Sequence, residues 1–169
     1  LTLEENKIYG LLGRNGAGKS TLLNIISNRV FADSGEVLYD GEAMTENDRL
    51  QKNIYLMSEK SFYSDNLNVK QIFGWTKEFY PDFDYDYAMK LSELFGLNTK
   101  KKVKQLSTGY SSIFKLILAL SVNTPFTFLD EPVLGLDANH RELFYKLLIE
   151  TYAENPRTFV LSTHLIEEV

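Results

Sequence analysis

Several features that would narrow the class of this protein are missing from its 169 residues. The chain has no cysteine, which excludes disulfides and thiolate metal sites and suits a reducing compartment. Its longest apolar run, residues 116–122, is far too short to cross a bilayer, and no signal-peptide pattern is found. The formal net charge of −5 argues against a general nucleic-acid binder, so no nucleic-acid partner is expected.

What the chain does have is an alternation of strand-like and helix-like patterns. The predicted strands are Lys7–Leu12, Gly35–Gly41, Ile54–Met57, Phe126–Leu129 and Thr158–Leu161. Between residues 68 and 105 the pattern is wholly helical, with a start signal at Asn68 and stop signals at Pro81 and Gly96. We therefore expect one α/β domain over residues 1–169. Its core (1–67 and 106–169) would contain a mainly parallel sheet, and residues 68–105 would form an inserted α-helical subdomain.

A glycine-rich segment, GRNGAGKST, follows the first predicted strand and precedes a helical pattern. It fits G-x-x-x-x-G-K-[ST], in which backbone N–H groups surround phosphate oxygens. Lys19 is expected to reach the β- and γ-phosphates, and the Ser20 hydroxyl to bind Mg²⁺. The candidate nucleotide-binding residues are Gly13, Arg14, Asn15, Gly16, Ala17, Gly18, Lys19, Ser20 and Thr21. A turn that only joins strand to helix is the alternative, but the flanking pattern favours a P-loop NTPase core.

Two adjacent acids, Asp130 and Glu131, end the apolar strand in FTFLDEP. Side chains of neighbouring strand residues point in opposite directions, so each acid can have its own role. Asp130 fits an acid that holds Mg²⁺, and Glu131 a general base for the attacking water. The alternative is a pair of acids that only caps the next turn. His164 follows the last predicted strand, at the edge where ligands collect in open α/β sheets, and could contact the γ-phosphate.

The order of the phosphate loop, helical insert, LSTGY, FTFLDEP, GLD and STH resembles the ATP-binding cassette domain of ABC transporters. The resemblance covers nearly the whole chain. It implies that two cassettes pair head to tail and trap two ATP molecules. Ser107 and Gly109 would then contact the γ-phosphate bound by the partner cassette. The resemblance further implies that Asp137 lies across the interface, that Glu131 is the catalytic base and that His164 is the switch histidine.

The sequence departs from the family pattern at three places. Thr108 and Tyr110 replace the first glycine and the glutamine of Leu-Ser-Gly-Gly-Gln, while Ser107 and Gly109 are kept. Glu59 stands where the family has a glutamine that approaches the metal-bound water, so Glu59 is a candidate for the Mg²⁺ site; a solvated loop acid is the alternative. The family's adenine-stacking aromatic has no counterpart before Gly13, and the chain is therefore expected to be truncated at both ends.

In the family, a membrane subunit inserts a short coupling helix beside the helical subdomain. Aromatic residues are frequent in this region of the chain and are favoured as interface anchors. Periodicity assigns Phe73 and Tyr80 to the subdomain's own core. The candidates for the docking groove are Phe62, Tyr63, Phe83 and Tyr85.

These observations predict an ATP- and Mg²⁺-dependent ATPase subunit of an ABC transporter. It would form an ATP-sandwich dimer, homo- or heteromeric, with a second cassette and would drive transport through a separate transmembrane permease. The expected location is cytoplasmic, peripheral on the inner face of the cell membrane, and the motif form resembles bacterial exporters. The alternative is a soluble ABC-type ATPase that acts on ribosomes or DNA without a membrane partner. A P-loop small-molecule kinase would leave LSTGY and STH unexplained.

Overall fold

The computed structural model describes residues 1–60 and 63–164, which separate into two compact units. Among the described residues, the first unit comprises Leu1–Ser58, Thr124–Glu131 and residues 157–164, and the second comprises residues 59–60, 63–123 and Pro132–Pro156. The predicted α/β class with a parallel sheet is confirmed. The proposed division into a core and a subdomain at residues 68 and 105 stays a prediction.

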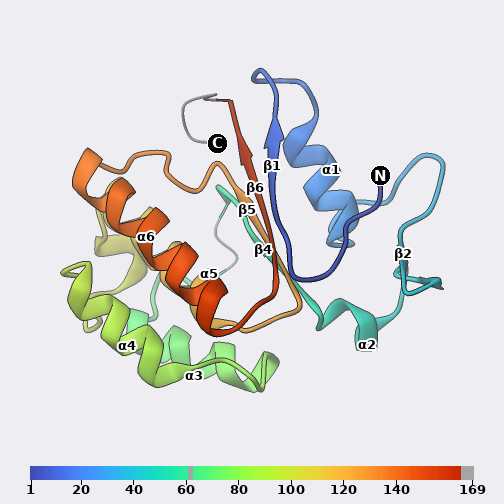
Figure 1. Ribbon diagram of the computed structural model, residues 1–169. Coiled ribbons are helices and arrows are strands. Elements are labelled where there is room, and N and C mark those ends of the chain that lie inside the picture. The colour runs from blue at the N-terminus through green and yellow to red at the C-terminus, as the bar shows by residue number, and fades with distance from the viewer. Residues whose placement is uncertain (61–62, 165–169) are drawn as a thin grey trace. The chain divides into compact units, whose positions relative to one another are not determined.

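A four-stranded parallel sheet forms the centre of the first unit (Figure 1). Its strands are β1 (Ile8–Leu12), β4 (Ile54–Met57), β5 (Phe126–Asp130) and β6 (Thr158–Thr163), in the order β1-β6-β5-β4. β6 is buried at every residue, as expected for a strand inside a covered parallel sheet. The register pairs Leu12 with Thr163 and Asp130 with Ser162. The residues that follow β1, β5 and β6 therefore emerge at one edge of the sheet.

One helix and a small hairpin complete this unit. Helix α1 (Lys19–Ile26) contacts β5, and its Leu23 joins a core cluster that contains Phe128. The predicted strand Gly35–Gly41 is wrong in its extent, because the structure has a hairpin of β2 (Leu38–Tyr39) and β3 (Glu42–Ala43). Its turn residues Asp40 and Gly41 both have positive φ, 50° and 81°. Asp-Gly is a strong signal for such a turn. A short helix, α2 (Asp48–Gln51), follows.

The second unit is helical. It contains α3 (Val69–Phe79), α4 (Tyr85–Leu94), the 3₁₀ turn η1 (Val103–Gln105), α5 (Thr108–Ser121) and α6 (Ala138–Glu154). The start signal at Asn68 is confirmed, since Asn68 and Gln71 form a reciprocal capping box. The stop signals are also met, because α3 ends before Pro81 and α4 before Gly96. Within the described residues, none of the helices combines the length and apolarity that a bilayer crossing requires.

An aromatic cluster fills the interior of the helical unit. Phe73 stacks on Phe114 with ring centres 6.1 Å apart, and Phe83 lies against Phe73 at 6.0 Å. The expectation that Phe83 lines a docking groove is therefore wrong, because its ring is buried in the unit's own core. Tyr85 also contacts Phe73, edge to face. Phe62 lies outside the described residues.

The core of the sheet unit gives a stability prediction. Phe128 in β5 is almost fully buried, and Phe128→Ala should lower the free energy of unfolding by about 3–5 kcal/mol through lost burial and a cavity. Phe31 is 71% exposed, so Phe31→Ala is the matched control and should change it by less than about 0.5 kcal/mol. Urea unfolding measures both. Equal effects of the two substitutions would contradict this placement of the core.

Candidate nucleotide-binding site

The phosphate loop joins β1 to α1 and depends on its glycines. Gly16 and Gly18 have φ of 81° and 95°, in the left-handed region, and Gly18 is the N-terminal cap of α1. A Cβ on Gly13 would lie 3.3 Å from the Ala17 Cβ, so the tight return of the loop leaves little room for a side chain. The loop residues at the surface are Arg14, Asn15, Ala17, Ser20 and Thr21. Helix α1 thus presents its N-terminus, which favours an anion, at the mouth of this loop.

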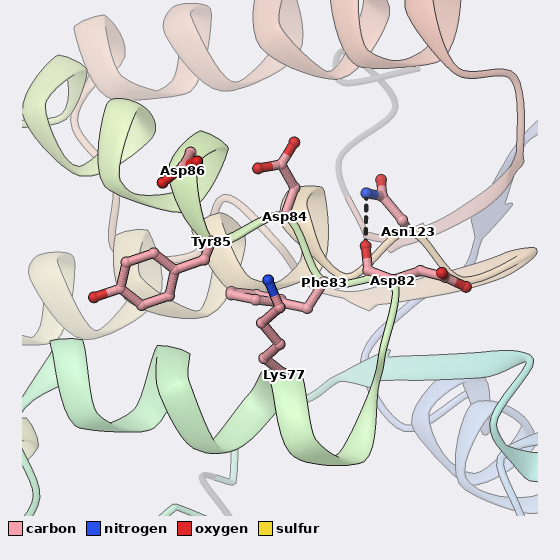
Figure 2. Close-up of a pocket in the computed structure, with 7 residues that line it drawn as sticks. All are labelled: Lys77, Asp82, Phe83, Asp84, Tyr85, Asp86 and Asn123. Atoms are coloured by element: carbon pink, nitrogen blue, oxygen red, sulfur yellow. Dashed lines mark hydrogen bonds between the residues drawn. The ribbon is translucent and has the colours of Figure 1, made fainter.

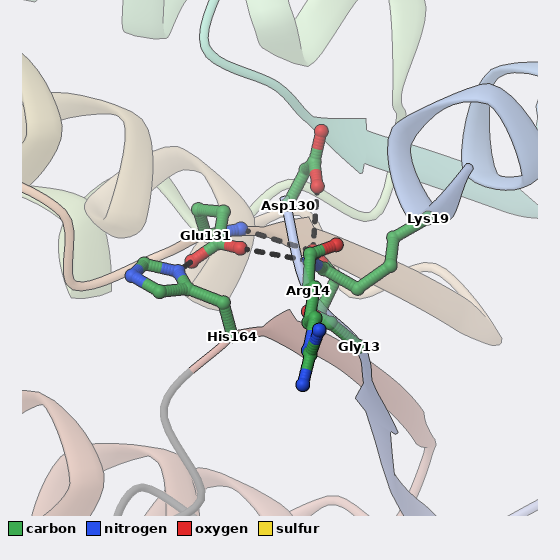
Figure 3. Close-up of polar contacts among 7 residues, drawn as sticks. Gly13, Arg14, Lys19, Asp130, Glu131 and His164 are labelled. Carbon is green, nitrogen blue, oxygen red and sulfur yellow. Dashed lines mark hydrogen bonds and ion pairs between the residues drawn. The ribbon is translucent and has the colours of Figure 1, made fainter. Parts of the chain in front are cut away.

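Lys19 places a buried positive charge in the site. Its side chain is only 8% exposed, and its Nζ donates to the Gly13 carbonyl at 2.7 Å. The same Nζ lies 3.3 Å from Glu131 Oε1, so an ion pair ties the loop to the turn after β5 (Figure 3). A buried ammonium needs such partners, because an unpaired one would lose its hydration without compensation.

Glu131 and His164 extend this ion pair. His164 Nδ1 lies 2.9 Å from Glu131 Oε2, so one carboxylate holds Lys19 with one oxygen and His164 with the other (Figure 3). Glu131 has a φ of 49°, a left-handed conformation that costs a non-glycine residue roughly 1–3 kcal/mol and is frequent at functional sites. The three residues predicted to be catalytic from sequence therefore lie together in the first unit.

Asp130, the other acid, is buried at the end of β5. Its Oδ1 accepts a hydrogen bond from Ser162 Oγ at 2.5 Å. A carboxylate here and the Ser20 hydroxyl on α1 are oxygen donors of the kind that Mg²⁺ uses together with substrate phosphates. Among the described residues, no group of three or more His, Asp or Glu side chains could hold a metal alone. This donor set fits an ion that arrives with a nucleotide. Ser162 is the first residue of the STH motif, but sequence reasoning assigned a role only to His164 and missed the contact of Ser162 with Asp130.

The LSTGY segment begins helix α5 in the second unit. Ser107 is the N-cap, and its Oγ accepts from the Tyr110 N–H at 3.3 Å. Gly109 lies in the first turn of α5, and a Cβ there would approach the Gly135 carbonyl to 3.2 Å, so this position has little room for a side chain. Ser112 also donates to the Leu134 carbonyl at 3.0 Å. LSTGY and GLD, far apart in sequence, are thus neighbours in the helical unit.

Asp137 and Tyr110 share a partner in His140. Asp137 caps α6, accepting from the His140 N–H at 2.9 Å, and its Oδ2 lies 2.9 Å from His140 Nδ1. The His140 ring in turn meets Tyr110 edge to face and stacks on Phe95. Hydrogen bonds from the His140 backbone and side chain lower the pKa of Asp137 below its ordinary value. The carboxylate of Asp137 is therefore the form that the fold stabilises.

Glu59, the candidate at the glutamine position, is an exposed residue of the helical unit. Its backbone carbonyl accepts a hydrogen bond from Lys115 Nζ on α5. Burial lowers the pKa of Lys115, and the charge of Glu59 opposes that shift. The structure thus fixes the Glu59 backbone, while its role at a metal stays a prediction.

A second acidic region lies at the end of α3. A pocket of about 420 Å³ is lined by Lys77, Asp82, Phe83, Asp84, Tyr85, Asp86 and Asn123 (Figure 2). Asp84 accepts from the Tyr87 N–H as the cap of α4, and Asn123 donates to the Asp82 carbonyl. Two of these residues therefore have structural roles, and the pocket is not a candidate metal centre.

Comparisons with known proteins agree with this geometry. The family model for ABC transporters matches residues 1–134. YtrB of Bacillus subtilis, an ABC transporter ATP-binding protein, is 34% identical over 169 residues, covering all of this chain and 58% of YtrB. YclP of the same organism, a petrobactin import ATP-binding protein, is 29% identical over 177 residues, covering 97% of this chain and 69% of YclP. The chain thus spans little more than half the length of YtrB.

The fold is shared with solved cassettes. The dimeric structure of MJ0796, a bacterial ABC transporter cassette, has a TM-score of 0.85 at 24% identity, covering 99% of this chain and 79% of MJ0796. A parallel sheet with a glycine-rich loop before α1 and a lysine as the first residue of that helix defines the P-loop ATPase class. Within that class, the chain belongs to the ABC transporter family, as an ATP-binding cassette.

The depressed pKa of Asp137 gives a pH prediction. An unfolded aspartate has a pKa of about 3.9, and the folded value lies lower, so the stabilisation is present above about pH 4 and is lost as pH falls through the folded pKa. Asp137→Asn can still cap α6 but does not titrate. Its urea midpoint should therefore fall less steeply below about pH 4 than that of the wild type. Asp33→Asn, in an exposed loop, is the control; parallel curves for wild type and Asp137→Asn would contradict the assignment.

Proposed function

We propose that this chain is the ATP-binding and ATP-hydrolysing domain of an ABC transporter. It would power transport through separate membrane subunits by means of an ATP-sandwich dimer. The observation that carries the proposal is the continuous contact of Lys19, Glu131 and His164 at the edge of the sheet. It joins a phosphate-binding cation, a carboxylate base and a histidine in one site.

The geometry supports a coupling between nucleotide binding and activation of the base. In the structure, Glu131 is the counter-ion of Lys19. A triphosphate carries more negative charge than one carboxylate and would take over Lys19, leaving Glu131 paired with His164 alone. Glu131 would then be available to accept a proton from the attacking water. Mg²⁺, held by Asp130 and Ser20, would neutralise the charge that develops on the phosphates.

The second loop supports a partner cassette. Ser107 and the first-turn amides of α5 are donors suited to an anion, and the site in the first unit already has its own phosphate loop. We therefore propose that Ser107 and Gly109 serve ATP bound by a second cassette. Asp137 and His140 would lie at the same interface. The dimer seen for MJ0796 is a precedent from a protein of the same fold.

An apolar groove on the helical unit supports a permease partner. It has a volume of about 290 Å³ and is lined by Tyr63, Ser64, Leu67, Ile72, Trp75, Thr76, Phe79 and Tyr80. Trp75 and Phe79 are 58% and 70% exposed, unusual for such large apolar side chains. We propose that this groove receives a membrane subunit, with the chain peripheral on the inner face of the membrane. YclP is named for import, so exporter-like character stays a prediction.

The hydrolytic role is tested with Glu131→Gln in the intact protein. The substitution removes the base but keeps the shape of the side chain, so turnover should fall by about 10²- to 10⁴-fold. ATP should remain bound, and size-exclusion chromatography with light scattering should detect an ATP-dependent dimer. Lys19→Ala should lose ATP binding, measured by calorimetry, whereas Glu36→Gln, at an exposed loop, should behave as the wild type. Normal turnover by Glu131→Gln would refute the assignment.

The permease role is tested by a Trp75→Ala/Phe79→Ala double variant. Because exposed aromatics act as interface anchors, the variant should lose about tenfold or more of its binding to the membrane subunit in detergent-solubilised co-purification. Its ATP binding should be unchanged. Ile149→Ala, which alters an equally exposed apolar residue on α6, is the control. Co-sedimentation of the wild type with ribosomes, without a membrane partner, would favour the alternative function.

A further inference from the structure

One buried hydroxyl links the two acids of the site. Ser162 lies in β6 with no exposed surface, opposite Asp130 in the register of the sheet. Its Oγ donates to Asp130 Oδ1 at 2.5 Å and accepts from the Glu131 N–H at 3.1 Å. A serine hydroxyl can donate only one hydrogen bond, and here Asp130 accepts it.

The bond to Asp130 fixes the orientation of a carboxylate. The terminal torsion of aspartate is broad, so a carboxylate without a directional partner samples many orientations. Mg²⁺ demands near-ideal octahedral geometry and tolerates little misplacement of its ligands. A hydrogen bond to Oδ1 therefore defines how the carboxylate can face an ion. Partners of this kind commonly change metal affinity by about 10- to 100-fold when removed.

The contact of Ser162 with Glu131 stabilises an unfavourable backbone conformation of Glu131. Glu131 has a φ of 49°, and its N–H is directed at both the carbonyl oxygen and the Oγ of Ser162, each 3.1 Å away. A glutamate keeps a left-handed backbone conformation only where contacts with the surrounding structure hold it there. Ser162 supplies both acceptors and so helps to hold the turn in which Glu131 meets Lys19 and His164.

We propose that Ser162 is a positioning residue for ATP hydrolysis, which orients Asp130 toward Mg²⁺ and holds the backbone of Glu131. This inference rests on the proposed ATPase function. A purely structural serine would also be buried and hydrogen-bonded, but its removal would change stability and leave metal binding unaltered. The two roles are therefore separable by measurement.

The chain offers a matched control. Ser121 on α5 is also fully buried, and its Oγ has no hydrogen-bond partner among the described residues. Ser121→Ala removes a buried hydroxyl of the same size without breaking a bond to either acid. Two further variants separate shape from donation: Ser162→Thr keeps a strong O–H donor, while Ser162→Cys keeps nearly the same shape with a weak donor.

The experiment measures metal binding as well as turnover in the intact protein. Mn²⁺ affinity is followed by electron paramagnetic resonance with a non-hydrolysable ATP analogue, and ATP affinity in EDTA by calorimetry. Ser162→Ala and Ser162→Cys should weaken Mn²⁺ binding and raise the half-saturating Mg²⁺ for hydrolysis by about tenfold. Their metal-free ATP affinity should stay within about twofold of wild type, since Lys19 and the loop are intact. Ser162→Thr should restore metal binding, and Ser121→Ala should leave it unchanged.

The possible results distinguish the inference from the function on which it rests. If the wild type binds Mn²⁺ with the analogue but does not hydrolyse ATP, the proposed function fails. If the wild type hydrolyses ATP and both Ser162→Ala and Ser162→Cys keep wild-type Mn²⁺ affinity, the positioning role of Ser162 is overturned. Should Ser162→Ala not fold, Ser162→Cys decides the question, because it creates no cavity.

Discussion

The burial of one ammonium group governs the arrangement of the sheet unit's site. Lys19 is 8% exposed and must be paired, since a buried charge without partners costs several kcal/mol. The Gly13 carbonyl and the Glu131 carboxylate meet that need from two different strand ends. The glycine-dependent loop and the left-handed turn at Glu131 bring these groups to one cation, and His164 contacts the same carboxylate. An anion with more charge than Glu131 could replace it, so the pairing that stabilises this site also makes it responsive to phosphate.

The parallel sheet makes this convergence possible. Residues 13, 131 and 164 are distant in sequence, but each comes directly after a strand of the same sheet, and parallel strands end at a common edge. The register between β5 and β6 also determines which side chains face each other at this edge. Because Asp130 is paired with Ser162, a hydroxyl on β6 reaches the acid on β5, and a shift of one residue would turn that side chain to the other face.

Local sequence signals predicted much of the fold and the phosphate loop. The helix start signal at Asn68 and the segment Gly13–Thr21 act over a few residues, so a single sequence suffices to find them. The Asp40-Gly41 pair is also a local turn signal, but the predicted strand Gly35–Gly41 extended over it. Ser162 and Phe83 were different, because their roles arise from strand register and from packing between helices. Such contacts join residues far apart in the chain, and a local pattern such as STH, which contains Ser162, does not reveal them.

The departures from the family pattern at LSTGY have a physical counterpart in the helical unit. Tyr110 gives the His140 ring an aromatic neighbour, and His140 in turn holds the Asp137 carboxylate. The close approach of Gly109 to Gly135 joins the same two segments through their backbones. The first turn of α5 and the start of α6 are therefore connected by backbone packing and by a ring contact, while the contact of His140 with Asp137 lies within the start of α6. A displacement of Tyr110 would disturb the His140 ring that contacts Asp137, so the LSTGY and GLD segments are coupled through this packing.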